Sequence, residues 1–75
     1  MSAQDTTEKY EKDIPEIVFL RIGDVESRVQ LTRRTVYRMV AAGTFPAPVN
    51  LTETRRAWVA SEVTEWQQAR MNDRK

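Results

Sequence analysis

The stretch TRRTVYRMVAAG, residues 32–43, has the pattern of a short helix with both of its ends marked. Thr32 is a suitable N-cap, because its hydroxyl can accept a hydrogen bond from an N–H group of the first turn. Gly43 suits the left-handed backbone that follows a helix, and Pro46 prevents continuation. The apolar residues recur at the i, i+3 and i+4 spacing of one helix face, and they are Val36, Met39 and Val40. We therefore predict a helix over residues 32–42 with one buried face.

A shorter helix is expected directly before this one, over about residues 23–29. Val25 and Val29 lie one turn apart on one face, and Asp24 suits the positively charged N-terminal end. The link between the two helices, about residues 30–32, is short. Two short helices joined this tightly are typical of a helix-turn-helix.

A small hairpin, or wing, is expected after the second helix. Residues 45–48 (FPAP) form an extended connector, and residues 49–51 and 56–59 are predicted strands around a polar tip, residues 52–55. The tip has no Asn-Gly or Asp-Gly pair, so the pattern leaves its turn geometry open. The apolar run at residues 17–20 is either a brief strand or an extended lead-in beneath the domain.

A last helix is expected over about residues 62–71, with Ser61 as its N-cap. Val63 and Trp66 form its inner stripe, and Trp58 and Trp66 are expected to be the largest pieces of the core. The predicted core consists of Val25, Val36, Met39, Val40, Phe45, Trp58, Val63 and Trp66.

Together these elements predict a mainly α fold with a small β-hairpin, a winged helix-turn-helix over residues 16–71. The chain has 75 residues, which suits one small domain. Residues 1–15 are polar and acidic, end at Pro15, and are expected to form a disordered leader. Residues 72–75 are expected to fray at the C-terminus.

The composition argues against several classes of protein. The chain has no cysteine and no histidine, which excludes disulfides and thiolate or imidazole metal sites. Ser27 and Ser61 have no base partner, so we expect no enzyme, no catalytic residue and no cofactor. No apolar run approaches the ~20 residues of a membrane span. We therefore expect a soluble, intracellular protein without a membrane partner.

Positive charge is concentrated in the middle of the chain. Residues 1–26 hold three basic against seven acidic residues, whereas residues 27–58 hold six arginines against Glu53 alone. The planar arginine fork fits phosphates and guanine edges. From charge alone, nucleic-acid contact and an ordinary solvated surface are both open.

Arg34 and Arg38 lie one turn apart on the face of helix 32–42 opposite Val36. Like charges at this spacing repel, and no carboxylate lies within residues 30–48 to relieve them. An anionic partner explains such a face better than solvation does. We therefore predict that this helix enters the major groove of double-stranded DNA.

Other candidate DNA contacts lie beside these two arginines and on the wing. Tyr37 either donates to a phosphate or closes the edge of the core. Arg55 and Arg56 lie along the minor groove or the flanking backbone, unless the wing is an ordinary polar loop or Arg56 pairs with a nearby carboxylate. Thr32 and Thr35 are expected both to cap their helix and to contact phosphates. The predicted DNA-binding residues are Thr32, Arg33, Arg34, Thr35, Tyr37, Arg38, Thr54, Arg55 and Arg56.

Five ordered segments carry a family resemblance. They are FLRIGDV at 19–25, LTRRTVY at 31–37, GTFPAPV at 43–49, AW at 57–58 and VTEW at 63–66. As a set they closely resemble the AlpA family of phage and mobile-element regulators. The resemblance implies a MerR-like winged helix-turn-helix that binds DNA through its second helix and its wing. Related wings often carry a glycine at the turn, whereas residues 52–54 have none.

The resemblance also implies a role as an excisionase, or recombination directionality factor. We expect such a protein to bind and bend DNA beside an attachment site, together with an integrase and neighbouring copies of itself. Small size and a lone DNA-binding domain favour this expectation. A transcriptional regulator of phage or mobile-element genes is the alternative. An alternative of another class is a small protein-interaction adaptor or inhibitor, with the acidic leader and the last helix as contact surfaces.

Overall fold

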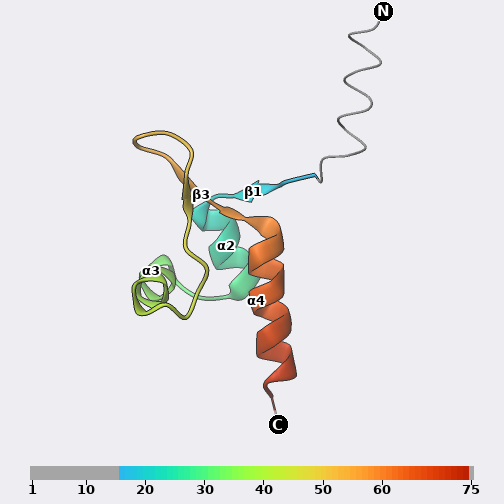
Figure 1. The fold of residues 1–75 in the computed structure, drawn as a ribbon. Helices are drawn as coiled ribbons and strands as arrows, with labels where there is room; N and C mark the ends of the chain where they lie inside the picture. The colour runs from blue at the N-terminus through green and yellow to red at the C-terminus, as the bar shows by residue number, and fades with distance from the viewer. Residues whose placement is uncertain (1–15, 75) are drawn as a thin grey trace, which may run out of the picture.

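Within residues 16–74 the chain folds as three helices around a small antiparallel sheet (Figure 1). A computed structural model describes these residues, so the predicted leader, residues 1–15, and Lys75 of the predicted frayed end lie outside the described part. The elements in chain order are β1 (Phe19–Leu20), α2 (Ile22–Val29), α3 (Arg33–Ala42), β2 (Val49–Asn50), β3 (Arg56–Val59) and α4 (Ala60–Asn72). This arrangement confirms the predicted mainly helical fold with a small β-hairpin.

β3 is the central strand of the sheet, with β1 on one side and β2 on the other, and both pairings are antiparallel. β2 and β3 form the predicted wing. Of the apolar run 17–20, strand structure begins only at Phe19, which pairs with Val59. The carbonyl of Val18 accepts a hydrogen bond from the N–H of Ala60 at 2.8 Å. The run is therefore a brief strand with an extended lead-in.

α3 begins and ends where its sequence pattern predicts. The N–H of Thr35 donates to Oγ1 of Thr32 at 3.3 Å, which confirms the predicted N-cap. At the other end Gly43 has a φ of 80°, and its N–H donates to the carbonyl of Val40 at 3.1 Å. Both ends of the helix are thus determined by residues of the quoted stretch itself.

The turn between α2 and α3 depends on Gln30, which the sequence pattern does not single out. Its φ of 59° and ψ of 39° are left-handed, a conformation that costs a residue with a Cβ about 1–2 kcal/mol. The backbone N–H of Gln30 donates to the carbonyl of Glu26 at 2.8 Å, and its Nε2 donates to the carbonyl of Ser27 at 2.7 Å. These bonds end α2 and turn the chain toward α3.

The core lies between the helices and β3. Its buried side chains are Val25, Val36, Phe45, Ala57, Trp58 and Val63. Three further predicted core residues, Met39, Val40 and Trp66, are partly buried against this cluster. Ala57 is absent from the predicted core because a small side chain gives a weak hydrophobic signal, yet its place on the central strand buries it.

The predicted N-cap of the last helix is wrong. α4 begins at Ala60 with Val59 at the N-cap position, so Ser61 lies inside the first turn, and no side chain caps the helix. The reason is that β3 continues directly into α4. Val59 is held by its pairing with Phe19, and the N–H of Ala60 donates to the carbonyl of Val18. Strand pairing, and not a local cap, sets the start of α4.

Two indole N–H groups hold the connector between α3 and β2. Nε1 of Trp58 donates to the carbonyl of Pro46 at 2.8 Å, and Nε1 of Trp66 donates to the carbonyl of Thr44 at 2.9 Å. The ring of Tyr37 on α3 also lies 5.8 Å from the ring of Trp58 on β3, centroid to centroid. These contacts fix the wing relative to α3, and Figure 1 shows both on the same side of the molecule, with the wing loop above α3.

Candidate nucleic-acid interface

α3 presents two arginines on the face opposite the core. Val36 is fully buried, whereas Arg34 and Arg38 are exposed. Within residues 16–74 neither of these two guanidinium groups forms an ion pair. The structure therefore places both side chains on the outer face of the helix, one turn apart, without a carboxylate partner in the described part of the chain.

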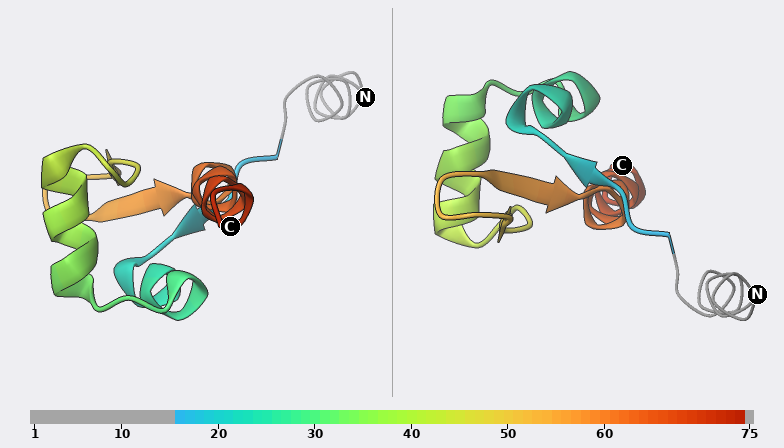
Figure 2. Two further views of the ribbon diagram at one scale, coloured as in Figure 1. Left: turned by 90° about the horizontal axis from the view of Figure 1, so that it is seen from below. Right: turned by 90° about the horizontal axis from the view of Figure 1, so that it is seen from above.

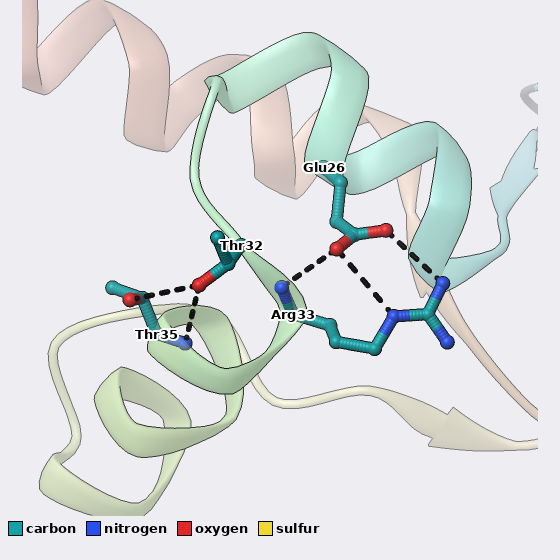
Figure 3. A network of polar contacts seen from close by, with 4 residues as sticks. All are labelled: Glu26, Thr32, Arg33 and Thr35. Carbon is teal, nitrogen blue, oxygen red and sulfur yellow. Dashed lines mark hydrogen bonds and ion pairs between the residues drawn. The ribbon is translucent and has the colours of Figure 1, made fainter.

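Arg33, the arginine beside them, is bound to the preceding helix (Figure 3). Its Nη2 lies 3.1 Å from Oε1 of Glu26, and its Nε donates to Oε2 of Glu26 at 3.4 Å. The backbone N–H of Arg33 also donates to Oε2 at 2.7 Å. One carboxylate on α2 thus holds both the side chain and the first backbone N–H group of α3.

The protonation of this pair follows from its geometry. The side-chain hydrogen bond from Arg33, followed by the bond from its backbone N–H, lowers the pKa of Glu26 below its ordinary value of 4.5. The same side-chain hydrogen bond raises the pKa of Arg33. Both groups are therefore charged at neutral pH, and the helix pair is joined by a charge-assisted contact.

Thr32 and Thr35 are engaged with each other at the N-terminus of α3 (Figure 3). Besides accepting from the N–H of Thr35, the hydroxyl of Thr32 donates to Oγ1 of Thr35 at 3.1 Å. The predicted capping role is confirmed for Thr32 alone, because Thr35 supplies the N–H that is capped and, within the described residues, its hydroxyl bonds only the hydroxyl of Thr32. Their contact with phosphate stays a prediction.

Arg28 joins α2 to α4, although by sequence it is one of the basic residues of the middle segment. Its Nη2 donates to Oγ1 of Thr64 at 2.7 Å and to Oε1 of Gln67 at 2.6 Å. Nε2 of Gln67 donates back to the carbonyl of Arg28 at 2.8 Å. This reciprocal bonding ties α2 to α4 across a separation of 39 residues, and no local sequence signal reports it.

The tip of the wing closes without a glycine. The N–H of Leu51 donates to the carbonyl of Arg55 at 2.8 Å. The hydroxyl of Thr52 accepts from the N–H of Thr54 at 3.3 Å and from the N–H of Arg55 at 3.0 Å. A threonine side chain thus supplies the turn contacts that the sequence pattern leaves open.

The basic residues of the wing are free of acidic partners in the described part of the chain. Thr54, Arg55 and Arg56 are all exposed. Within residues 16–74 neither Arg55 nor Arg56 forms an ion pair, so the expected alternative of Arg56 pairing with Glu53 or an acidic group of α2 does not occur there. The wing is therefore a basic hairpin.

The wing and α3 occupy the same edge of the molecule. In Figure 1 both lie on the left, with the wing loop above α3 and α4 on the right, and in both views of Figure 2 they lie on the side away from α4. Tyr37 lies on this edge of α3 with 39% of its surface exposed, and its ring packs near Trp58. Its packing role is thus visible, while its contact with a phosphate stays a prediction.

The described residues contain no grouping of acidic side chains suited to a metal ion. Among the helices between residues 16 and 74, none is both long and apolar enough to cross a membrane.

A helix-turn-helix with an outward basic helix, beside a basic hairpin on the same edge, defines a winged helix-turn-helix domain of the DNA-binding class. Comparison with known proteins gives the particular family. Residues 18–71 match the family described as "Prophage CP4-57 regulatory protein (AlpA)", and the chain belongs to this family. The resemblance seen in the sequence motifs is thereby confirmed.

One relative of the chain comes from a phage. The chain is 40% identical over 63 residues to the "Uncharacterized protein ORF88" of Enterobacteria phage P4. The aligned region covers 84% of this chain and 72% of the phage protein.

Proposed function

We propose that this protein binds double-stranded DNA in a sequence-specific manner, with α3 in the major groove. The observation that carries the proposal is a contrast among arginines. Arg28 and Arg33 are held by neighbouring side chains, whereas Arg34 and Arg38 are exposed and have no acidic partner among residues 16–74. A bidentate contact from such an arginine to guanine contributes about 1–3 kcal/mol to discrimination.

The other proposed contacts position the protein on the backbone. Thr32 and Thr35 lie at the N-terminus of α3, where backbone N–H groups favour phosphate. The guanidinium of Arg33 is paired with Glu26. A phosphate contact from Arg33 would therefore be made in addition to this ion pair. The full proposed set is Thr32, Arg33, Arg34, Thr35, Tyr37, Arg38, Thr54, Arg55 and Arg56.

The proposed role is that of an excisionase, which binds and bends DNA beside an attachment site and biases an integrase toward excision. Its support is the membership in a prophage regulatory family and the similarity to a phage protein. Neighbouring copies of the protein and an integrase are the proposed partners, at the bacterial nucleoid in the cytoplasm. The description of the family as regulatory also favours a second function, transcriptional regulation of phage or mobile-element genes.

Footprinting tests DNA binding directly. The purified protein is titrated onto DNA from upstream of its own gene and from the nearest integration site, with Arg34→Ala and Arg38→Ala beside the wild type. We expect protection of spaced sites that both substitutions weaken. Arg74→Ala, which removes an exposed arginine beyond the end of α4, is the charge-matched control and is expected to bind like the wild type. If the wild-type protein protects no DNA site even at low salt, the proposal is wrong.

Two further assays separate the two roles. In a reconstituted reaction with the cognate integrase, an excisionase raises the yield of excised product. In a promoter reporter, a regulator changes expression without integrase. Unchanged excision together with a changed reporter would assign the protein to regulation alone.

A further inference from the structure

A hollow opens between the wing and the start of α2. Its lining residues are Arg21, Ile22, Leu51, Thr54, Arg55 and Arg56. The first two precede and begin α2, and the other four belong to the wing, so the tertiary fold brings together residues about thirty positions apart. Half of the lining residues are arginines.

The hollow has no counter-charge among the residues that form it. Asp24 and Glu53, the acidic residues closest to it along the chain, are not part of its lining. The Oδ2 atom of Asp24 accepts from the backbone N–H of Arg21 at 3.2 Å, which leaves the guanidinium out of that contact. Within residues 16–74 none of the three lining arginines forms an ion pair. Three cations therefore share one open space, an arrangement that an anion relieves.

The chemistry of the hollow suits a DNA backbone. The hollow is open to solvent, so a phosphate that belongs to a long polymer can reach it. Guanidinium forks and the Thr54 hydroxyl can donate to phosphate oxygens. The aliphatic side chains of Ile22 and Leu51 also line the hollow and can pack against a sugar.

We propose that Arg21, together with Arg55 and Arg56, binds a backbone phosphate of the DNA whose bases α3 reads. This inference rests on the proposed function and deepens it. It assigns the wing to backbone contact and not to base readout in the minor groove. It also adds Arg21, which lies in the acidic N-terminal part of the sequence and is not among the predicted DNA-binding residues.

A backbone contact has a signature that a base contact lacks. It strengthens binding to every sequence alike, and it releases a counterion, so it steepens the dependence of log K on log salt by about 0.9 for each phosphate. Loss of Arg21 should therefore lower the affinity for specific and scrambled duplexes by the same factor, about tenfold. Loss of Arg34 should instead lower the affinity for the specific duplex far more.

The test measures dissociation constants by fluorescence anisotropy for specific and scrambled duplexes over a salt series. The proteins are the wild type, Arg21→Ala, Arg21→Lys and the charge-matched control Arg74→Ala. Because Arg21 uses only its backbone N–H in the contact with Asp24, Arg21→Ala should fold normally, and a thermal denaturation curve checks this. Arg21→Lys keeps the charge but loses the fork, so we expect it to keep the salt slope and lose part of the affinity.

A second measurement locates the phosphate itself. Single methylphosphonate substitutions remove the charge of one phosphate at a time from the specific duplex. We expect one position, adjacent to the base pairs protected by α3, to weaken the wild type by about tenfold or more. The same substitution should weaken Arg21→Ala by a smaller factor, because only Arg55 and Arg56 remain to contact that phosphate. If Arg21→Ala binds like Arg74→Ala with the same salt slope, the phosphate site is overturned while the Arg34 results still stand for the proposed function. If the wild type binds no duplex at all, the proposed function fails and the phosphate site with it.

Discussion

Arg33 and Glu26 join the two helices of the helix-turn-helix through one carboxylate. Glu26 on α2 accepts from the guanidinium of Arg33 at 3.1 Å and from the backbone N–H of Arg33 at 2.7 Å. An arginine of the basic helix is thus used to orient that helix. The neighbouring Arg34 and Arg38, without such a partner in the described residues, are left for an external ligand.

The Glu26 contact predicts a pH dependence of stability. Because the pKa of Glu26 is lower in the folded chain than its ordinary value of 4.5, the carboxylate stabilises the fold fully above pH 4.5. That contribution is lost as the pH falls through the lowered pKa. We expect Glu26→Gln to lower the urea midpoint at neutral pH, and the gap to the wild type to close in acid. Glu65→Gln, at an exposed position of α4, is the matched control and should show no such gap. A gap that persists in acid would mean that the carboxylate charge is not the cause.

Arg28 and Arg34 are expected to give opposite phenotypes although both are arginines of the basic segment. Arg28→Ala removes the bonds to Thr64 and Gln67, so we expect a loss of about 1–3 kcal/mol in the free energy of unfolding. DNA affinity of the folded variant should be close to that of the wild type. Urea denaturation and anisotropy measure the two quantities. In a double-mutant cycle, Gln67→Ala should cost less in the Arg28→Ala background than in the wild type, because only its bond to the backbone carbonyl of residue 28 remains there. Full additivity would show that the network is not coupled.

Arg34→Ala and Arg38→Ala should leave stability unchanged, because both side chains are exposed and without an ion pair in residues 16–74. Each should lower the affinity for the specific duplex by about 1–3 kcal/mol if its guanidinium contacts a guanine. The affinity for a scrambled duplex should fall much less. Equal losses on both duplexes would reassign the arginine to a phosphate.

The hydroxyl of Thr52 is expected to hold the wing in shape. Thr52→Val keeps the size of the side chain and removes the acceptor for the N–H groups of Thr54 and Arg55. We expect faster amide hydrogen exchange at those two residues and weaker DNA binding, with little change in the stability of this exposed site. Thr52→Ser restores the acceptor and should behave like the wild type. Unchanged exchange in Thr52→Val would show that the strand pairing alone closes the wing.

Local signals predicted the parts of the fold that depend on neighbouring residues. Thr32 and Gly43 mark the ends of α3 because capping is decided within one turn of chain. The spacing of Val36, Met39 and Val40 predicted the buried face of α3, because the helical repeat is also a local property of the chain. The family motifs predicted the fold as a whole, and the structure and the family match over residues 18–71 confirmed it.

Local signals could not predict structure that depends on contacts between residues far apart in the chain. The start of α4 follows the pairing of Val59 with Phe19, forty residues earlier in the chain, and so Ser61 was taken for a cap that the helix does not use. The closing of the wing by Thr52 is a local contact, and it went unpredicted for another reason, which is that the turn has no glycine signature.

The sequence by itself determined that the chain has a basic middle segment and a helix that turns two arginines away from its apolar face. Periodicity and local capping suffice for that, since they act between residues a few positions apart. Only the tertiary structure decided which arginines remain available. Glu26 engages Arg33, Gln67 engages Arg28, and the meeting of α2 with the wing gathers Arg21 beside Arg55. The physical reason is that the use of a charge depends on which groups the fold brings within a few ångströms of it, and the order of residues along the chain does not contain that distance.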